Sequence, residues 1–271
     1  MSIAFHKYHG LGNDFIVVDV ARDDALTQEE AVRMCDRHFG IGADGVLLVS
    51  PSEHARAKMT VLNADGSRPE MCGNGLRCVV LHLLRRAQRL GESPAAFEVD
   101  TDSGVLVCSV EKRADGLPWI RTQINAAKPL GDFSFKWAKK NLRFVRLATG
   151  NPHAVLFDSA FGVRDIDRIG PAVSDAIEGG ANVEFVSSDK DGGLDVVVWE
   201  RGVGRTLACG TGAAAVVAAA AAQERVPFGQ PVNVRLPGGT LEITVSEADL
   251  SLTVVGPATH VCDGSLASRF K

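Results

Sequence analysis

The pattern of apolar and polar positions recurs twice along the chain. In each half, a strand rich in β-branched residues precedes a stretch with helical character, and two alternating strands joined by a short turn follow it. We expect these elements at 59–63, at 76–90 and around a turn at 102–104 in the first half, and at 195–201, at 213–225 and around a turn at 237–239 in the second. This order predicts an α+β protein.

Three pairs of similar segments share one register. GNDFIVVD resembles GNPHAVLFD, GADGVLLVS resembles GANVEFVS, and EMCGNG resembles LACGTG. The first two pairs begin at Gly12 and Gly150 and at Gly42 and Gly180, each 138 residues apart, and the third centres on Cys72 and Cys209, 137 residues apart. The chain is therefore predicted to contain two copies of one unit.

The stretch after Cys209, AAAVVAAAAAQ, is apolar on every side and nearly without bulk. Such a helix is typical of a position enclosed by other elements. We expect two pseudo-symmetric domains, each a mixed, mostly antiparallel sheet or barrel wrapped around a central helix. The expected division is 1–117, joined by the tail 263–271, and 118–262.

Composition narrows the class of protein. The 271 residues are 45% hydrophobic and 23% charged, and the net charge is −4 with no basic cluster, so nucleic acid is not an expected partner. The first residues lack the pattern of a secretory signal. The longest apolar run, 213–222, is shorter than the ~20 residues that span a bilayer. A cytoplasmic protein without a membrane partner is expected.

Six cysteines are present, and none forms a CxxC pair. Disulfides are not expected in a cytoplasmic chain of this size. No ligand spacing predicts a metal site. Four of the cysteines, Cys35, Cys78, Cys108 and Cys262, are expected to be small buried hydrophobic residues.

Cys72 and Cys209 differ because each precedes Gly-x-Gly and a helix. A helix start presents unpaired N–H groups and a positive dipole, which lower the pKa of a thiol and bind a carboxylate. Matching places in two repeats predict one sulfur on each side of a substrate carbon. One thiolate would remove an α-proton, and the other thiol would protonate the opposite face.

These residues resemble the diaminopimelate epimerase family. The resemblance is carried by GLGNDF (10–15), RHFGIGADG (37–45), NADGS (63–67), MCGNGLRC (71–78), TGNPHAV (149–155), ANVEFV (181–186) and ERGVGRTLACGTG (200–212). It implies an isomerase without pyridoxal phosphate or another cofactor that interconverts LL- and meso-diaminopimelate for lysine and peptidoglycan synthesis. It also implies a homodimer.

The resemblance further implies roles for individual residues. Cys72 and Cys209 match the two catalytic thiols, and His153 and Glu200 match positions that adjust them. The matched substrate-binding positions are Asn13, Asn63, Gly73, Asn74, Asn151, Asn182, Glu200, Arg201, Gly210 and Thr211. Gly45 and Arg205 depart from the family pattern and are not assigned to the site.

Three alternatives stay open from the residues. The first is a racemase or epimerase of the same fold that acts on another amino acid, such as histidine or hydroxyproline. The second is a hydrolase or transferase with a single nucleophilic cysteine and a histidine. The third is a binding protein for small molecules in which the paired cysteines have no chemical role.

Overall fold

The computed structural model describes residues 2–113, 116–188 and 193–267, which form two compact units. Unit 1 comprises Met1–Thr122 with Gly256–Lys271, and unit 2 comprises Gln123–Val255. This division differs by a few residues from the expected one, since the chain rejoins unit 1 at Gly256 rather than at residue 263. Residues 268–271 of the expected tail lie outside the described residues.

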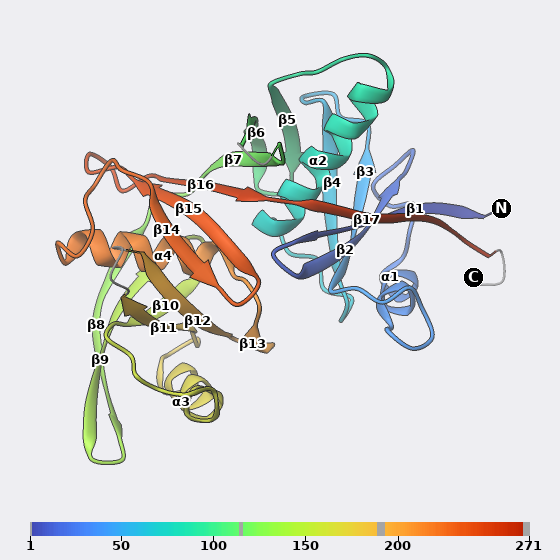
Figure 1. Cartoon of the computed structure of the whole chain (residues 1–271). Helices are drawn as coiled ribbons and strands as arrows, with labels where there is room; N and C mark the ends of the chain where they lie inside the picture. Colours follow the sequence, from blue (N-terminus) through green and yellow to red (C-terminus); the bar gives the residue numbers. More distant parts are fainter. Residues whose placement is uncertain (1, 114–115, 189–192, 268–271) are drawn as a thin grey trace. The chain divides into compact units, whose positions relative to one another are not determined.

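Unit 1 is a mixed sheet with two helices (Figure 1). The strands lie in the order β17-β1-β2-β3-β4-β5-β6-β7, and only the pairs β2/β3 and β4/β5 are parallel. The elements are β1 (Ile3–Gly10), β2 (Asn13–Asp19), α1 (Gln28–Cys35), β3 (Gly45–Ser50), β4 (Ala57–Asn63), α2 (Gly73–Arg89), β5 (Ala96–Thr101), β6 (Gly104–Lys112), β7 (Pro118–Ile124) and β17 (Thr259–Leu266).

Unit 2 repeats this arrangement. Its strands lie in the order β8-β9-β10-β11-β12-β14-β15-β16, only β10/β11 and β12/β14 are parallel, and β13 pairs with β12. The elements are β8 (Lys128–Trp137), β9 (Lys140–Ala148), β10 (Pro152–Leu156), α3 (Val163–Ala176), β11 (Asn182–Ser188), β12 (Leu194–Glu200), β13 (Gly204–Thr206), α4 (Gly210–Ala222), β14 (Val232–Leu236), β15 (Gly239–Val245) and β16 (Leu252–Pro257). The shared order and directions confirm the prediction of an α+β fold with two similar domains.

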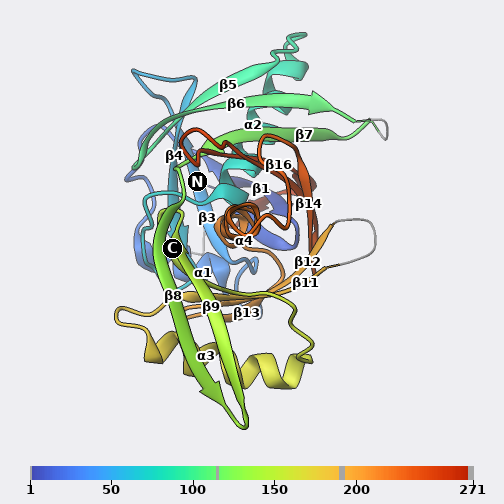
Figure 2. The same ribbon diagram turned by 90° about the vertical axis from the view of Figure 1, so that its left-hand side faces the viewer.

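One helix is enclosed in each unit. Residues 74–84 of α2 are all buried, and the helix packs on β1 to β5 and β17. Residues 212–221 of α4 are likewise buried, and this helix packs on β9, β10, β11, β14 and β15 (Figure 2, which looks nearly along its axis). Alanine and valine keep α4 narrow enough to be enclosed. The predicted central helices are therefore present, and each begins three residues earlier than expected.

Candidate active site

Cys72 and Cys209 occupy the same structural position in their units. Each is the N-cap of the central helix, with extended dihedral angles of φ −136°, ψ 114° for Cys72 and φ −123°, ψ 111° for Cys209. Each sulfur accepts a hydrogen bond at 3.4 Å from the backbone N–H three residues later, that of Gly75 or Gly212. An N-cap is usually serine, threonine, aspartate or asparagine. Sulfur as the cap in both units makes the two thiols the candidate reactive groups.

In unit 1, a chain of side-chain amides begins beside Cys72. The amide of Asn74 donates to Asn13 Oδ1 at 3.0 Å, and the amide of Asn13 donates to Asp44 Oδ2 at 2.8 Å. These bonds fix the orientation of the Asn74 and Asn13 amide groups. Asn63 does not join this chain, since its amide donates to Ser67 Oγ at 2.9 Å.

Arg77 is a charged residue of the central helix that the motif analysis did not single out. Its side chain is 2% exposed and donates to Asn74 Oδ1 at 2.7 Å and to the carbonyl of Pro257 at 3.3 Å. Burial lowers the pKa of Arg77, and the thiol groups of Cys78 and Cys72 oppose that shift. An arginine within MCGNGLRC, where the second copy has Ala214, was the available signal.

In unit 2, the surroundings of Cys209 act against its ionisation. Burial raises the pKa of Cys209 well above its ordinary value, and the carboxylates of Glu200 and Glu184 raise it further. The Thr211 hydroxyl, 3.4 Å from the sulfur, and the Gly212 N–H oppose this rise. The expectation that a helix start lowers the thiol pKa is therefore wrong for Cys209, because desolvation outweighs the dipole.

The two carboxylates that act on Cys209 differ in exposure, since Glu200 is half-buried and Glu184 is fully buried. Burial raises the pKa of Glu200, while hydrogen bonds from Thr206, at 2.5 Å, and from Cys209 lower it. Glu184 is fully buried, and its Oε1 lies 2.7 Å from His153 Nδ1. A Cβ on Gly212 would lie 2.7 Å from the same oxygen, so a larger residue there would force the Glu184 carboxylate to shift. Glu184 is not among the residues expected from the sequence; the available signal was a charged residue where the first copy has Val46.

The other expected residues of unit 2 form two groups. Asn151 Oδ1 lies 3.0 Å from Nε2 of His153, which joins Asn151 to Glu184. Asn182 Oδ1 accepts the backbone N–H of Arg201 at 2.9 Å, and the Arg201 guanidinium donates to the carbonyl of Gly179. The Arg205 guanidinium instead donates a hydrogen bond to Asp167 Oδ1 at 3.0 Å.

The remaining cysteines separate into two classes. Cys35, Cys78 and Cys108 are buried, as expected. Cys262 is exposed, so its expected burial is wrong. It lies on β17, where most side chains face solvent.

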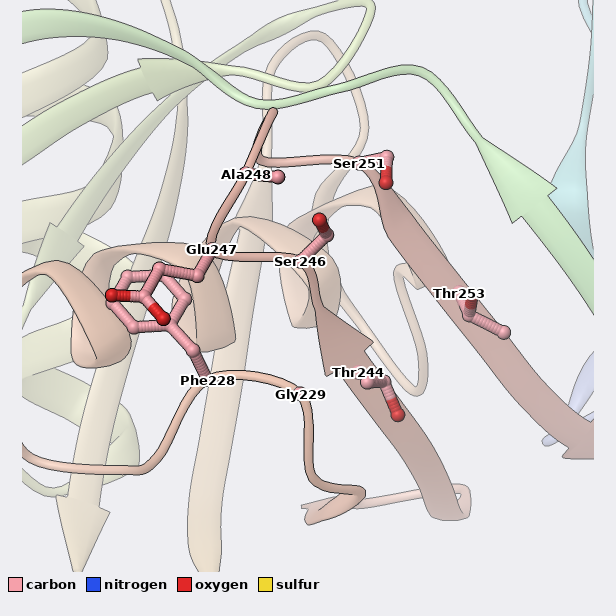
Figure 3. A pocket seen from close by; sticks show the side chains of 8 residues that line it. All are labelled: Phe228, Gly229, Thr244, Ser246, Glu247, Ala248, Ser251 and Thr253. Carbon is pink, nitrogen blue, oxygen red and sulfur yellow. The ribbon is translucent and has the colours of Figure 1, made fainter.

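A pocket of about 400 Å³ lies in unit 2 beside the β15–β16 hairpin (Figure 3). None of the expected site residues lines it. Its lining residues are Phe228, Gly229, Thr244, Ser246, Glu247, Ala248, Ser251 and Thr253, which include no cation to bind a carboxylate.

In the described part of the chain, no helix is long and apolar enough to cross a membrane.

Solved structures share the fold at low sequence identity. A phenazine biosynthesis protein of Bacillus anthracis superposes with a TM-score of 0.76 at 18% identity, covering 98% of this chain and 99% of that one. A hydroxyproline epimerase of Agrobacterium vitis superposes with a TM-score of 0.74 at 15% identity, covering 98% and 91%.

Sequence comparison identifies the family. The model of the diaminopimelate epimerase family matches residues 5–124 and 145–261. The chain is 39% identical to diaminopimelate epimerase 1 of Nostoc sp., over 98% of this chain and 100% of the relative, and 36% identical to the diaminopimelate epimerase of Desulfitobacterium hafniense, over 96% of both. The chain therefore belongs to the diaminopimelate epimerase family, and it is an isomerase of the epimerase class.

Proposed function

We propose that this protein interconverts LL- and meso-diaminopimelate without a cofactor, using Cys72 and Cys209 as the acid-base pair at one α-carbon. The observation that carries the proposal is the matching position of the two thiols, each capping the buried central helix of a similar unit. Membership of the diaminopimelate epimerase family supports diaminopimelate as the substrate. The same proposal places the reaction in lysine and peptidoglycan synthesis by a cytoplasmic homodimer.

Binding is assigned to the helix starts and the polar side chains around them. The N–H groups of the first turns, at Gly73-Asn74 and Gly210-Thr211, would hold the reacting carboxylate, because a helix start favours an anion. The distal ammonium and carboxylate would contact the amides and charged groups of the other expected positions. These are Asn13, Asn63, Asn151, Asn182, Glu200 and Arg201.

The surroundings of the two thiols favour opposite protonation states. A buried guanidinium, Arg77, acts on Cys72, whereas the buried carboxylate of Glu184 and the half-buried carboxylate of Glu200 act on Cys209. A nearby cation stabilises a thiolate, and nearby anions stabilise a thiol. We therefore assign the resting thiolate to Cys72 and the resting thiol to Cys209, a choice that the repeat alone leaves open.

The proton transfers then balance. The Cys72 thiolate takes the α-proton, and the electrons of the broken C–H bond move into the carboxylate to give an enediolate. The Cys209 thiol delivers its proton to the opposite face, where those electrons form the new C–H bond. The product leaves with Cys72 protonated and Cys209 ionised, so the opposite isomer is the substrate for the reverse step.

Isotope exchange in heavy water tests this proposal. Wild-type enzyme should epimerise LL- and meso-diaminopimelate and place deuterium at the α-carbon. Cys72→Ser and Cys209→Ser should each lose epimerisation, while Cys262→Ser, the matched exposed control, should keep it. Absence of exchange by the wild type would contradict an epimerase, and full activity in either variant would indicate a single-cysteine enzyme. Activity on histidine or hydroxyproline, without activity on diaminopimelate, would show that the substrate is that other amino acid.

A further inference from the structure

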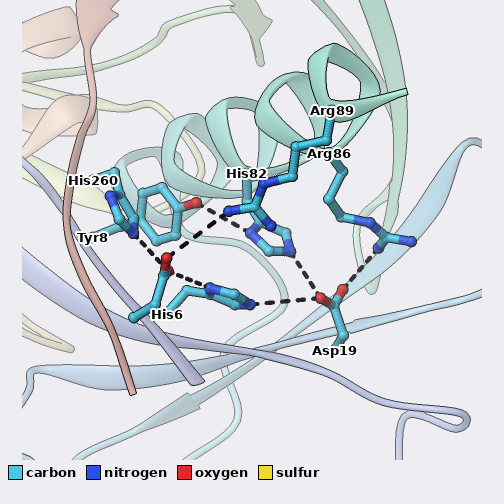
Figure 4. Close-up of polar contacts among 8 residues, drawn as sticks. His6, Tyr8, Asp19, His82, Arg86, Arg89 and His260 are labelled. Carbon is cyan, nitrogen blue, oxygen red and sulfur yellow. Dashed lines mark hydrogen bonds and ion pairs between the residues drawn. The ribbon is translucent and has the colours of Figure 1, made fainter. Parts of the chain in front are cut away.

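Unit 1 contains a second cluster of titratable side chains, which the proposed mechanism does not use (Figure 4). His6 on β1 and His82 on α2 have ring centroids 4.7 Å apart, with the ring planes tilted by 46°. Both direct Nε2 toward Oδ2 of Asp19 on β2, at 3.9 Å from His6 and 3.1 Å from His82. The three donor atoms all lie within 4.8 Å of one another.

The distances from Asp19 Oδ2 to the two imidazole nitrogens match those between ligands around one metal ion. Nitrogen and oxygen ligands lie about 2.1 Å from zinc in a tetrahedral site, which places neighbouring ligands roughly 3.4 Å apart. The observed 3.1 and 3.9 Å bracket that value. The neighbouring set of His6, His260 and Asp263 is less suited, because its 2.5 and 2.7 Å contacts are hydrogen bonds too short for two ligands of one ion.

The other polar atom of each donor residue has its own partner. His6 Nδ1 lies 2.5 Å from Asp263 Oδ1, and His82 Nδ1 lies 3.1 Å from the Tyr8 hydroxyl. Asp19 Oδ1 accepts from Arg86 at 2.8 Å. Such outer partners orient metal ligands and select the histidine tautomer.

We propose that His6 Nε2, His82 Nε2 and Asp19 Oδ2 bind one divalent transition metal ion of the zinc class, with water completing the coordination. Two imidazoles and one carboxylate favour zinc, cobalt or nickel over magnesium or calcium. On binding, the N–H proton that His82 Nε2 shares with Asp19 in the metal-free protein would move to Nδ1, where the Tyr8 hydroxyl can accept a hydrogen bond from it. The Asp19 side chain is 41% exposed, which leaves the ion a route from solvent.

The ion would act on the fold and not on the reacting atoms. His82 follows Cys72 by ten residues along the helix, which is about 15 Å at 1.5 Å per residue. The bound ion would link β1, β2 and α2. It would therefore stabilise the folded unit whose central helix begins at Cys72. This inference does not depend on the proposed epimerisation.

Binding of cobalt(II) to the full-length protein tests the site, since its visible absorption reports coordination geometry and a thiolate ligand adds a charge-transfer band. We expect one ion per chain, a raised melting temperature and no thiolate band. His6→Gln and Asp19→Asn should weaken binding at least about tenfold, and Asp263→Asn by roughly 10- to 100-fold.

The matched control is His54→Gln, an exposed histidine of the same unit, which should bind as the wild type does. Circular dichroism of each variant without metal shows that it is folded. No binding by the wild type, equal binding by folded His6→Gln and Asp19→Asn, or a thiolate band would each overturn the proposal.

Discussion

His153 Nδ1 lies 2.7 Å from Glu184 Oε1, and both side chains are completely buried. The two residues come from the neighbouring parallel strands β10 and β11, so the sheet itself holds them together. Glu184 also raises the pKa of Cys209. The pair therefore connects an expected site residue to the candidate acid through a carboxylate that the motif analysis did not identify.

Glu184→Gln should move the ionisation of Cys209 to lower pH. The substitution removes one of the negative charges that raise the Cys209 pKa, so the thiolate forms more readily. Epimerisation should fall roughly tenfold or more, because the lowered pKa leaves less of Cys209 protonated to act as the acid. His153 also loses its carboxylate partner. The measurement is the pH dependence of Cys209 alkylation in a Cys72→Ser background. Glu247→Gln, an exposed control in unit 2, should match the parent, and an unshifted Glu184→Gln profile would refute the assignment.

Arg77→Met should shift the alkylation of Cys72 to higher pH, since the buried cation that favours its thiolate is removed. We expect epimerisation to fall by at least roughly tenfold. Arg77→Lys keeps the charge and should shift the profile less. Alkylation is followed in a Cys209→Ser background, with the exposed Arg33→Met as control. Equal profiles for the methionine and lysine variants would show that charge is not the cause.

Gly212→Ala should destabilise the protein by about 1–3 kcal/mol, because the new methyl group would overlap Glu184 Oε1 at 2.7 Å. Gly73→Ala is the matched substitution, since a Cβ there meets no atom within 4 Å. Urea denaturation measures both. The result is contradicted if the two variants unfold at the same urea concentration.

Asp263→Asn should destabilise the metal-free protein near pH 6, and this effect should disappear as the pH falls toward 2. Hydrogen bonding to His6, aided by His260 and opposed by partial desolvation, lowers the Asp263 pKa from 3.8 to about 2. A lowered folded-state pKa stabilises above the unfolded value of 3.8 and loses that effect as pH falls toward 2. With the side chain 46% exposed, we expect at most about 1 kcal/mol near pH 6. Thermal unfolding with a chelator from pH 6 to pH 2 checks this, and a constant difference between variant and wild type would exclude the linkage.

Much of the fold could be predicted from local patterns. The repeat, the enclosed helices and the two hairpins follow from apolar periodicity and glycine-containing turns, which act over a few residues. The hairpins close as predicted, with Thr101 opposite Gly104 and Leu236 opposite Gly239. The placement of both cysteines at helix starts follows from the same local signals.

Within the sequence alone, Cys72 and Cys209 are equivalent, because the repeat gives both the same motif and the same helix start. Only the tertiary structure distinguishes them, by burying Arg77 near one and Glu184 near the other. It also gathers His6, Asp19 and His82, which no local spacing connects. The physical reason is that desolvation and electrostatic interactions depend on distances in space, which strand pairing brings about between residues far apart in the chain.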